Sequence, residues 1–287
     1  MTLPAGELTS IRSPRLKAAR QLGKRALRQR ARRFLAEGPQ AAGEALAAGV
    51  VSQLFLTATA HARYHELAHR AAAQGVDVQP VSGEVMAELA QTVTPQGILA
   101  VCRFIDVQLA QVLTAAAPAA LVVVLASVRD PGNAGTVLRT ADAAGADAVL
   151  FAGSSVDPYN SKCVRASAGS LFHLPIVVGT PVPDAVQALR QAGLRVLAAD
   201  GGAQRTLDDL HADGALGRRT GWLFGNEAWG LPAGARALAD EAVAVPIYGR
   251  AESLNLAAAA AVCLYASARA QRAHQPGRAA PAGREEQ

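Results

Sequence analysis

The segment VPIYGRAESLNL, residues 245–256, joins a short apolar run at 242–247 to an alanine-rich stretch at 256–270 that has a helical pattern. Gly249 is a turn signal, and the polar side chains of Glu252, Ser253 and Asn255 follow it on either side of one leucine. Serine and asparagine are preferred residues at a helix N-cap. A structural cap therefore accounts for this junction as well as a functional site does.

Two earlier junctions have the same character. Residues 129–139 read RDPGNAGTVLR, and residues 224–232 read FGNEAWGLP. Each stretch follows an apolar, strand-like run and combines glycines with asparagine and a charged residue. Three junctions of one kind favour a shared functional site over three unrelated helix caps.

Together the three stretches resemble the motifs of the SpoU (TrmH) family of RNA ribose 2′-O-methyltransferases, in the SPOUT superfamily. The first is similar to N-x-G-x-x-x-R, the second to G-N-E-x-x-G-[LM] and the third to S-L-N. The motif positions are Asn133, Gly135 and Arg139, then Gly225, Asn226, Glu227, Gly230 and Leu231, then Ser253, Leu254 and Asn255. The resemblance covers roughly residues 119–270, and a weaker one covers 13–105.

Strand-like and helical stretches alternate through the chain, and this alternation predicts an α/β fold. The continuous apolar run at 121–125 suits a strand that is buried on both faces of a parallel sheet, and the later alternation predicts a doubly wound layout. The resemblance further implies a deep trefoil knot of the SPOUT type and a homodimer formed through the knot region. Periodicity predicts neither, because threaded chains are nearly absent among ordinary folds.

The chain is long enough for two domains. We predict that residues 1–12 are disordered, that 13–107 form a small α/β domain, and that 108–118 are a linker. The resemblance implies that the domain at 13–107 binds the RNA substrate. Residues 119–273 are then the SPOUT methyltransferase domain with its C-terminal knot. The tail at 274–287 contains prolines and glycines and is predicted to be disordered.

Residues 12–33 contain ten lysines and arginines and no acidic residue. A solvated helix face normally mixes both signs of charge, so we interpret this run as a surface that contacts RNA phosphates. Within it, Arg28, Arg30, Arg32 and Arg33 are the candidate RNA-binding residues. The formal net charge of +5 also favours an anionic partner.

The resemblance implies methyl transfer from S-adenosylmethionine to a ribose 2′-oxygen, with the cofactor bent between the loops of the second and third motifs. Glycine at position 225 allows the close backbone approach that such a loop needs. The implied cofactor-binding residues are Gly225, Val245 and Leu254, followed by Ala199, Glu227, Leu231 and Ile247.

The catalytic residues implied by the resemblance are Asn133, Arg139, Glu227, Ser253 and Asn255. Arg139 acts in the family either as general base or as an electrostatic clamp on a phosphate and the developing alkoxide, and both roles stay open. The clamp is the favoured role because a guanidinium keeps its proton to a pKa above about 12.

Ribosomal RNA, and 23S RNA in particular, is favoured over transfer RNA because a separate basic domain suits a structured ribosomal segment. A non-catalytic RNA-binding protein with a methyltransferase fold is the alternative of another class, and the presence of Asn133, Arg139 and Asn255 argues against it. A dinucleotide-dependent oxidoreductase is disfavoured because no G-x-G-x-x-G follows a predicted strand.

Cys102, Cys163 and Cys263 lie far apart without a C-x-x-C, which argues against a zinc site and a disulfide framework, so we expect no metal. Residues 1–10 lack the pattern of a signal peptide. The longest apolar run, residues 256–266, is shorter than the ~20 residues that cross a bilayer. We therefore predict a soluble, cytoplasmic protein without a membrane partner.

Overall fold

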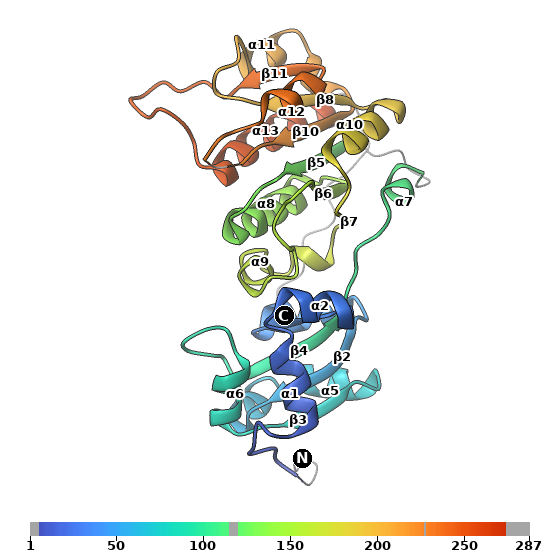
Figure 1. Ribbon diagram of the computed structural model, residues 1–287, viewed down its shortest axis with the longest axis vertical. Coiled ribbons are helices and arrows are strands. Elements are labelled where there is room, and N and C mark those ends of the chain that lie inside the picture. The colour runs from blue at the N-terminus through green and yellow to red at the C-terminus, as the bar shows by residue number, and fades with distance from the viewer. Residues whose placement is uncertain (1–5, 115–119, 227, 274–287) are drawn as a thin grey trace. The chain divides into compact units, whose positions relative to one another are not determined.

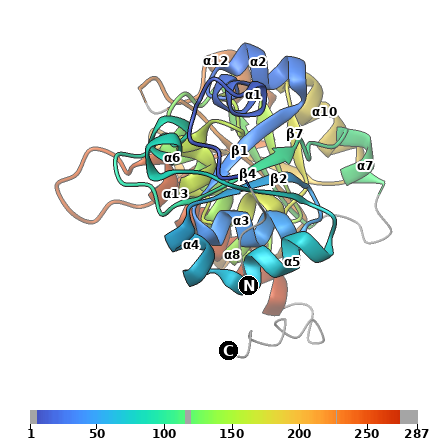
Figure 2. The same cartoon turned by 90° about the horizontal axis from the view of Figure 1, so that it is seen from below.

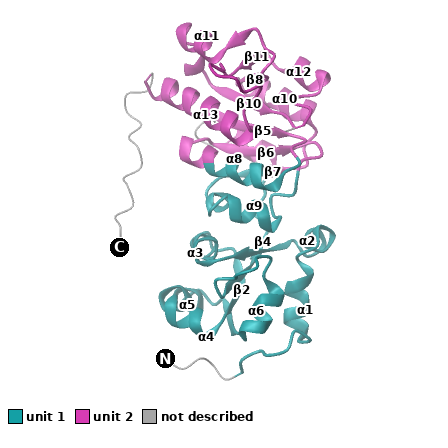
Figure 3. Cartoon of the chain, turned by 90° about the vertical axis from the view of Figure 1, so that its left-hand side faces the viewer, with its two compact units in different colours: residues 1–107, 129–139, 156–176 teal, residues 108–128, 140–155, 177–287 magenta. Residues whose placement is uncertain are grey.

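The computed structural model describes residues 6–114, 120–226 and 228–273 (Figure 1). The chain divides into two compact units, coloured separately in Figure 3. The first comprises residues 1–107, 129–139 and 156–176, and the second comprises 108–128, 140–155 and 177–287. The predicted division at 108–118 therefore captures only part of the arrangement, because two later segments belong to the first unit.

The first unit contains a four-stranded sheet in the order β1-β4-β2-β3. Strand β4 is antiparallel to β1 and β2, and β3 is parallel to β2. The strands are β1 (Arg33–Glu37), β2 (Val51–Leu56), β3 (Asp77–Pro80) and β4 (Ile98–Arg103). The helices are α1 (Pro14–Gln21), α2 (Arg25–Ala31), α3 (Pro39–Ala47), α4 (Ala58–Arg63), α5 (His65–Ala73), α6 (Gly83–Leu89) and α9 (Ser161–Ala166).

Helices cover this sheet on both faces, and Figure 2 shows α1 and α3 on opposite sides of it. Successive side chains of a strand point to opposite faces, so Leu35 and Phe55 lie under α1 and α6 while their neighbours point the other way. Leu16 of α1 and Met86 of α6 complete that buried cluster. Because helices bury both faces of this sheet, the first unit has a hydrophobic core of its own.

The prediction of disorder for residues 1–12 does not hold at Leu8 and Ile11. The Leu8 N–H donates to the Pro80 carbonyl at 2.9 Å, and both side chains pack against the cluster under α1 and α6. Residues 1–5 and the predicted tail at 274–287 lie outside the described residues. In the predicted linker, residues 109–113 form helix α7 (Leu109–Leu113), and 115–119 lie outside the described residues.

The second unit contains a seven-stranded sheet in the order β7-β6-β5-β10-β8-β11-β9. Its strands are β5 (Leu121–Ala126), β6 (Ala148–Ala152), β7 (Ile176–Val178), β8 (Arg195–Ala199), β9 (Arg205–Thr206), β10 (Thr220–Phe224) and β11 (Glu241–Ala244). Its helices include α10 (Val182–Gln191), α11 (Leu207–Ala212), α12 (Ala233–Leu238) and α13 (Leu256–Ala273), and α8 (Pro131–Ala144) runs from the first unit into the second.

The pairings of β10 with β5 and β8, of β5 with β6 and of β11 with β8 are all parallel. Every residue of β5 and β10 is buried, as the continuous apolar run at 121–125 predicted. Trp222 of β10 donates from Nε1 to the Ser267 hydroxyl of α13 at 2.9 Å, so this large side chain is both packed and hydrogen-bonded. The predicted parallel α/β fold is confirmed, whereas the knot stays a prediction.

Candidate active site

A cavity of about 480 Å³ opens in the second unit at the carboxyl ends of β8, β10 and β11. Ligands of open parallel sheets bind at this edge because the loops that leave the strands converge there. The loops of the second and third motifs both line the cavity. Five of the predicted cofactor-binding residues are among the lining residues, namely Ala199, Gly225, Val245, Ile247 and Leu254, as are the predicted catalytic residues Ser253 and Asn255.

Two of the predicted cofactor-binding residues are not placed there. Leu231 is half-buried beside the second motif loop but does not line the cavity. Glu227, predicted both as a catalytic and as a cofactor-binding residue, lies outside the described residues.

The second motif forms a loop that closes on itself. The Asn226 N–H donates to the Gly230 carbonyl at 2.9 Å, and the Gly230 N–H donates back at 2.8 Å. A Cβ on Gly225 would lie 2.3 Å from the Gly230 carbonyl carbon, so only glycine fits at that position. The same absence of a side chain leaves the Gly225 backbone exposed to the cavity.

Asn226 anchors this loop and was recognised as a motif residue but not predicted as a site residue. Its Nδ2 donates to the Ser127 carbonyl at 3.2 Å, and its Oδ1 accepts from the Ala228 N–H at 2.8 Å. The first of these bonds joins the loop after β10 to the residue that follows β5. Asp200, Gly201 and Glu252 also line the cavity but were not predicted as site residues, although Asp200 directly follows the strand-like run at 194–199.

The third motif combines a helix cap with a cavity wall. The Asn255 Oδ1 accepts from the Ala257 N–H at 2.9 Å, so Asn255 caps α13 as the structural interpretation of this junction required. Asn255 nevertheless lines the cavity together with the exposed side chains of Glu252 and Ser253. Asn255 is therefore both the cap of α13 and a part of the cavity wall.

The first motif opens α8 and belongs to the first unit. Asp130 precedes the helix and accepts from the Asn133 N–H at 2.7 Å, and its other oxygen pairs with Lys162 at 2.8 Å. The hydrogen bond from Lys162, followed by that from Asn133, lowers the pKa of the Asp130 carboxyl below its ordinary value of 3.8. The start of α8 is therefore held by a charged cap at neutral pH.

Asn133 is half-buried near the start of α8, and Arg139 is exposed further along the same helix. At 3.6 residues and 5.4 Å per turn, six residues separate their side chains by about 120° around the axis and about 9 Å along it. The two side chains therefore do not share one face of α8. Both belong to the first unit, whereas the cavity belongs to the second.

The cavity has the chemistry that an adenosine-type sulfonium cofactor requires. Val243, Val245 and Leu254 give the cavity apolar walls of the kind that a nucleobase packs against, and the backbone beside Gly225 borders the same space. The carboxylates of Asp200 and Glu252 line the same space and would attract a positive charge.

The structure separates the four candidate RNA-binding arginines by environment. Arg28 is only 4% exposed, and its guanidinium donates to Asp157 at 2.7 Å and to the carbonyls of Leu22 and Gly23 at 2.9 Å. The prediction of a phosphate contact is therefore wrong for Arg28, because protein acceptors occupy its guanidinium.

The other three candidates are exposed at the surface of the first unit. Arg32 pairs with Asp106 at 2.9 Å and stacks over Phe104, whereas Arg30 and Arg33 make no ion pair with any residue that the structure describes. Arg30 and Arg33 are thus the better placed of the candidates for a phosphate contact.

The SpoU rRNA Methylase family model matches residues 120–265, and a model of the MRM3-like substrate binding domain matches residues 13–100. The chain belongs to the SpoU rRNA methylase family. It is 32% identical over 262 residues to the 23S rRNA (guanosine(2553)-2′-O)-methyltransferase RlmP of Bacillus subtilis, covering 90% of this chain and 98% of that protein. It is 35% identical to an uncharacterized tRNA/rRNA methyltransferase of Synechocystis, covering 94% of this chain and 96% of the relative.

Solved SpoU-type structures are similar over almost the whole chain. The AdoMet-bound rRNA methyltransferase from Sinorhizobium meliloti has a TM-score of 0.78 at 30% identity, covering 94% of this chain and 98% of that one. The SpoU methyltransferase AviRb from Streptomyces viridochromogenes, in complex with AdoMet, also has a TM-score of 0.78 at 30% identity, covering 91% and 100%. Membership of the SpoU family confirms the resemblance that the three motifs indicated.

Three further findings on this SpoU-family chain concern membrane-spanning helices, metal ligands and cysteines. None of the helices in the described ranges is long and apolar enough to cross a membrane. Across the same ranges, no three His, Cys, Asp or Glu side chains gather as metal ligands. All three cysteines are buried, and burial raises the pKa of the Cys263 thiol to about 12.

Proposed function

We propose that this chain transfers a methyl group from S-adenosylmethionine to a ribose 2′-oxygen of 23S ribosomal RNA. The observation that carries the proposal is the cavity between the second and third motif loops, which combines apolar walls, exposed backbone at Gly225 and two carboxylates. RlmP, named as acting on 23S RNA, and two related structures with bound AdoMet support the substrate and the cofactor. Transfer RNA remains the alternative substrate, and we place the activity in the cytoplasm, where both RNAs are found.

In this proposal the cofactor, when bound, would supply an electrophilic methyl group: the O–C bond would form as the S–C bond breaks, S-adenosylhomocysteine would leave, and the hydroxyl proton would pass to solvent water. Arg139 holds a phosphate beside the reacting ribose and stabilises the negative charge that develops on the 2′-oxygen. Asn133, Ser253 and Asn255 orient the ribose by hydrogen bonds. Val245 and Leu254 exclude water from the reacting atoms.

Replacement of Arg139 tests this assignment. Arg139→Ala should reduce the rate of methyl transfer on the order of 10²–10³-fold, because one charge-assisted contact to a developing oxyanion is lost. Arg139→Lys keeps the charge but not the planar fork, so it should recover only part of the rate. The measurement is single-turnover methyl transfer to 23S RNA, with S-adenosylmethionine affinity as the folding control; wild-type rates for Arg139→Ala would contradict the assignment.

The identity of the acceptor atom is tested separately. Mapping ribose methyl groups on total RNA with and without the gene should identify one nucleotide in 23S RNA. A fragment that carries 2′-deoxyribose at that nucleotide should accept no methyl group. Methylation of the deoxy fragment would contradict 2′-O transfer, and a site in transfer RNA would replace the ribosomal substrate with the alternative.

We also propose that the second unit dimerises and contains the SPOUT knot. Val262 and Tyr265 of α13 are each 44% exposed, and Tyr248 in the third motif loop is 87% exposed. Tyr248 and Val262 line a further cavity with Leu207 and Pro246, so the apolar side chains gather on one surface. Exposed apolar surface of this kind favours association, and a second copy of the chain is the partner that the family resemblance implies.

A further inference from the structure

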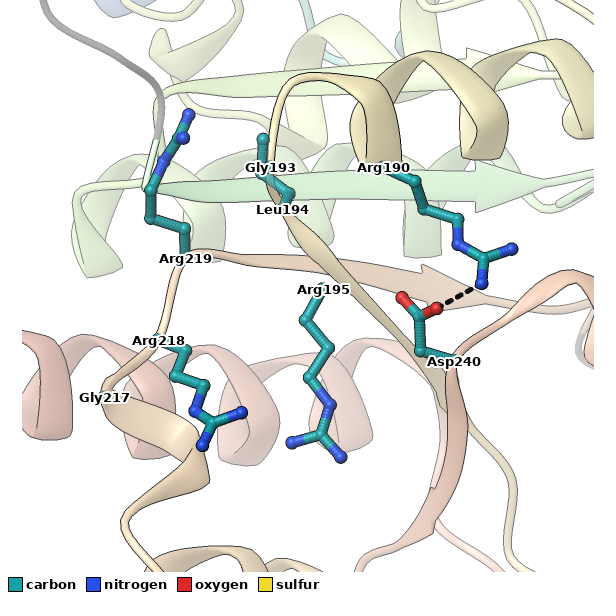
Figure 4. Close-up of a pocket in the computed structure, with 8 residues that line it drawn as sticks. All are labelled: Arg190, Gly193, Leu194, Arg195, Gly217, Arg218, Arg219 and Asp240. Atoms are coloured by element: carbon teal, nitrogen blue, oxygen red, sulfur yellow. Dashed lines mark ion pairs between the residues drawn. The ribbon is translucent and has the colours of Figure 1, made fainter.

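A second polar cavity, of about 670 Å³, opens at the opposite edge of the sheet in the second unit (Figure 4). The amino ends of β8 and β10 and the end of α10 enclose it. Its charged lining residues are Arg190, Arg195, Arg218, Arg219 and Asp240. The proposed methyl transfer uses none of these residues, because the cofactor cavity lies at the carboxyl ends of the same strands.

Two of the arginines have acceptors within the protein. Arg190 pairs with Asp240 at 2.6 Å, and Asp240 in turn accepts from the Val196 N–H at 2.8 Å. Arg219 donates to the Ala192 carbonyl at 2.8 Å, where a cation offsets the negative end of the α10 dipole. Figure 4 shows Arg190 turned toward Asp240 and Arg219 pointing away from the other arginines.

The other two arginines project from one face of the sheet. Arg195 is in register with Thr220, and its N–H donates to the Arg219 carbonyl at 2.9 Å. Arg218 has an extended backbone, with φ −80° and ψ 161°, and lies two residues before Thr220. Side chains two residues apart on a strand share a face, so Arg218 lies on the same face as Arg195. Figure 4 shows both side chains extending in the same direction.

The charge on this face is not balanced. The lining has four guanidinium groups and one carboxylate, a net charge of +3. Arg205, Asp213 and Glu241 form ion pairs beside it, and including them leaves a net charge of +2. Arg195 pairs with Glu241, whereas the exposed Arg218 side chain makes no hydrogen bond or ion pair with any residue that the structure describes. Arg218 is therefore the cation for which the fold supplies no acceptor.

We propose that Arg218 binds one phosphate group of the RNA backbone, and that Arg195, which Glu241 already holds, adds positive charge beside it. The choice of RNA as partner rests on the proposed function, and the chemistry rests on the guanidinium fork, which matches phosphate oxygens in two-pronged hydrogen bonds. Four steps of ~3.3 Å along β10 separate this edge from the cofactor cavity by about 13 Å. The phosphate therefore belongs to a nucleotide other than the one that is methylated.

Arg218→Gln in the full chain tests the site, with binding to a full-length 23S RNA transcript measured over a series of salt concentrations. The loss of one phosphate contact should reduce the slope of log K against log salt by about 0.7–0.9. Methyl transfer at saturating RNA should be unchanged while the apparent KM for RNA rises, because the contact lies away from the reacting ribose. Arg218→Lys keeps the charge and should retain most of the slope.

Arg190→Gln is the matched control, since it removes the same charge from the same cavity but from a guanidinium that Asp240 already holds. Its slope should equal that of the wild type. An unchanged salt slope for Arg218→Gln would overturn the proposal. An equal decrease for both variants would also overturn it, because the slope would then depend only on the net charge of the protein and not on a contact at Arg218. Methyl transfer to the transcript by the wild-type protein is measured in a separate assay. If the transcript is bound but never methylated, the proposed function is contradicted, whereas the comparison of salt slopes still tests the phosphate contact.

Discussion

At the scale of single residues, neighbours in one basic run have opposite roles. Arg28 and Arg30 are two positions apart on α2, but Arg28 is buried against Asp157 whereas Arg30 is exposed. The side chains of Arg28 and Asp157 are 5% and 3% exposed, so this ion pair lies in the interior of the first unit. A buried pair of this kind is strongly coupled to folding because neither charge has access to water.

Arg28→Met should therefore destabilise the protein by about 3–5 kcal/mol, since it leaves the Asp157 carboxylate buried and unpaired. The double variant Arg28→Met/Asp157→Asn removes that charge and should recover part of the loss. Denaturant unfolding measures both variants. Arg30→Gln is the control and should leave the free energy of unfolding unchanged while weakening RNA binding. If Arg28→Met lowered the free energy of unfolding by less than ~1 kcal/mol, the buried pair would contribute no more than a surface ion pair.

At the scale of elements, the glycine of the first motif sets how closely α8 approaches α9. A Cβ on Gly135 would lie 2.4 Å from the Cys163 carbonyl oxygen and 2.7 Å from the Ala166 Cβ. Both contacts are with groups that cannot rotate away. The motif glycine therefore has a packing role, distinct from any role in catalysis.

Gly135→Ala should force the two helices apart and destabilise the first unit by about 1–3 kcal/mol, as overpacking does elsewhere. Gly234 in α12 is the matched control, because nothing lies within 4 Å of a Cβ built there. Gly234→Ala should be neutral or stabilising by up to ~1 kcal/mol through helix propensity. Thermal unfolding of the two variants separates packing from propensity, and equal effects would contradict the packing role.

At the scale of the whole molecule, the proposed dimer gives a role to the apolar residues that the second unit leaves exposed. Val262→Glu combined with Tyr265→Glu places two charges on that surface of α13 and should convert the dimer into a monomer. Sedimentation measures the assembly. S-adenosylmethionine binding should be lost with it, because the third motif loop supplies both Tyr248 of this surface and Leu254 of the cofactor cavity.

Gln187→Glu on the exposed face of α10 is the control and should leave both the dimer and cofactor binding intact. A wild-type protein that sediments as a monomer and still binds the cofactor would contradict the dimer. A double variant that remains dimeric would instead place the interface on another surface.

The sequence by itself determined the features that depend on local pattern. The apolar run at 121–125 predicted a strand buried on both faces, and the junction at 255–256 predicted the cap of α13. The family resemblance carried by the second and third motifs also predicted a group of cofactor-cavity residues, since Gly225, Val245 and Leu254 all line one space. The strand and the cap need only the period, the spacing or the identity of neighbouring residues, whereas the cavity residues follow from the resemblance of the motifs to a family.

Only the tertiary structure decided which charged residues are available to a ligand. Arg28 finds Asp157 at a separation of 129 positions, and no pattern within the basic run distinguishes it from Arg30. Arg195 and Arg218 gather at one sheet edge because β8 and β10 pair in a particular register. Strand register and burial arise from contacts between distant segments. For that reason a run of like charges predicts an anionic partner, whereas the fold determines which of its cations can meet one.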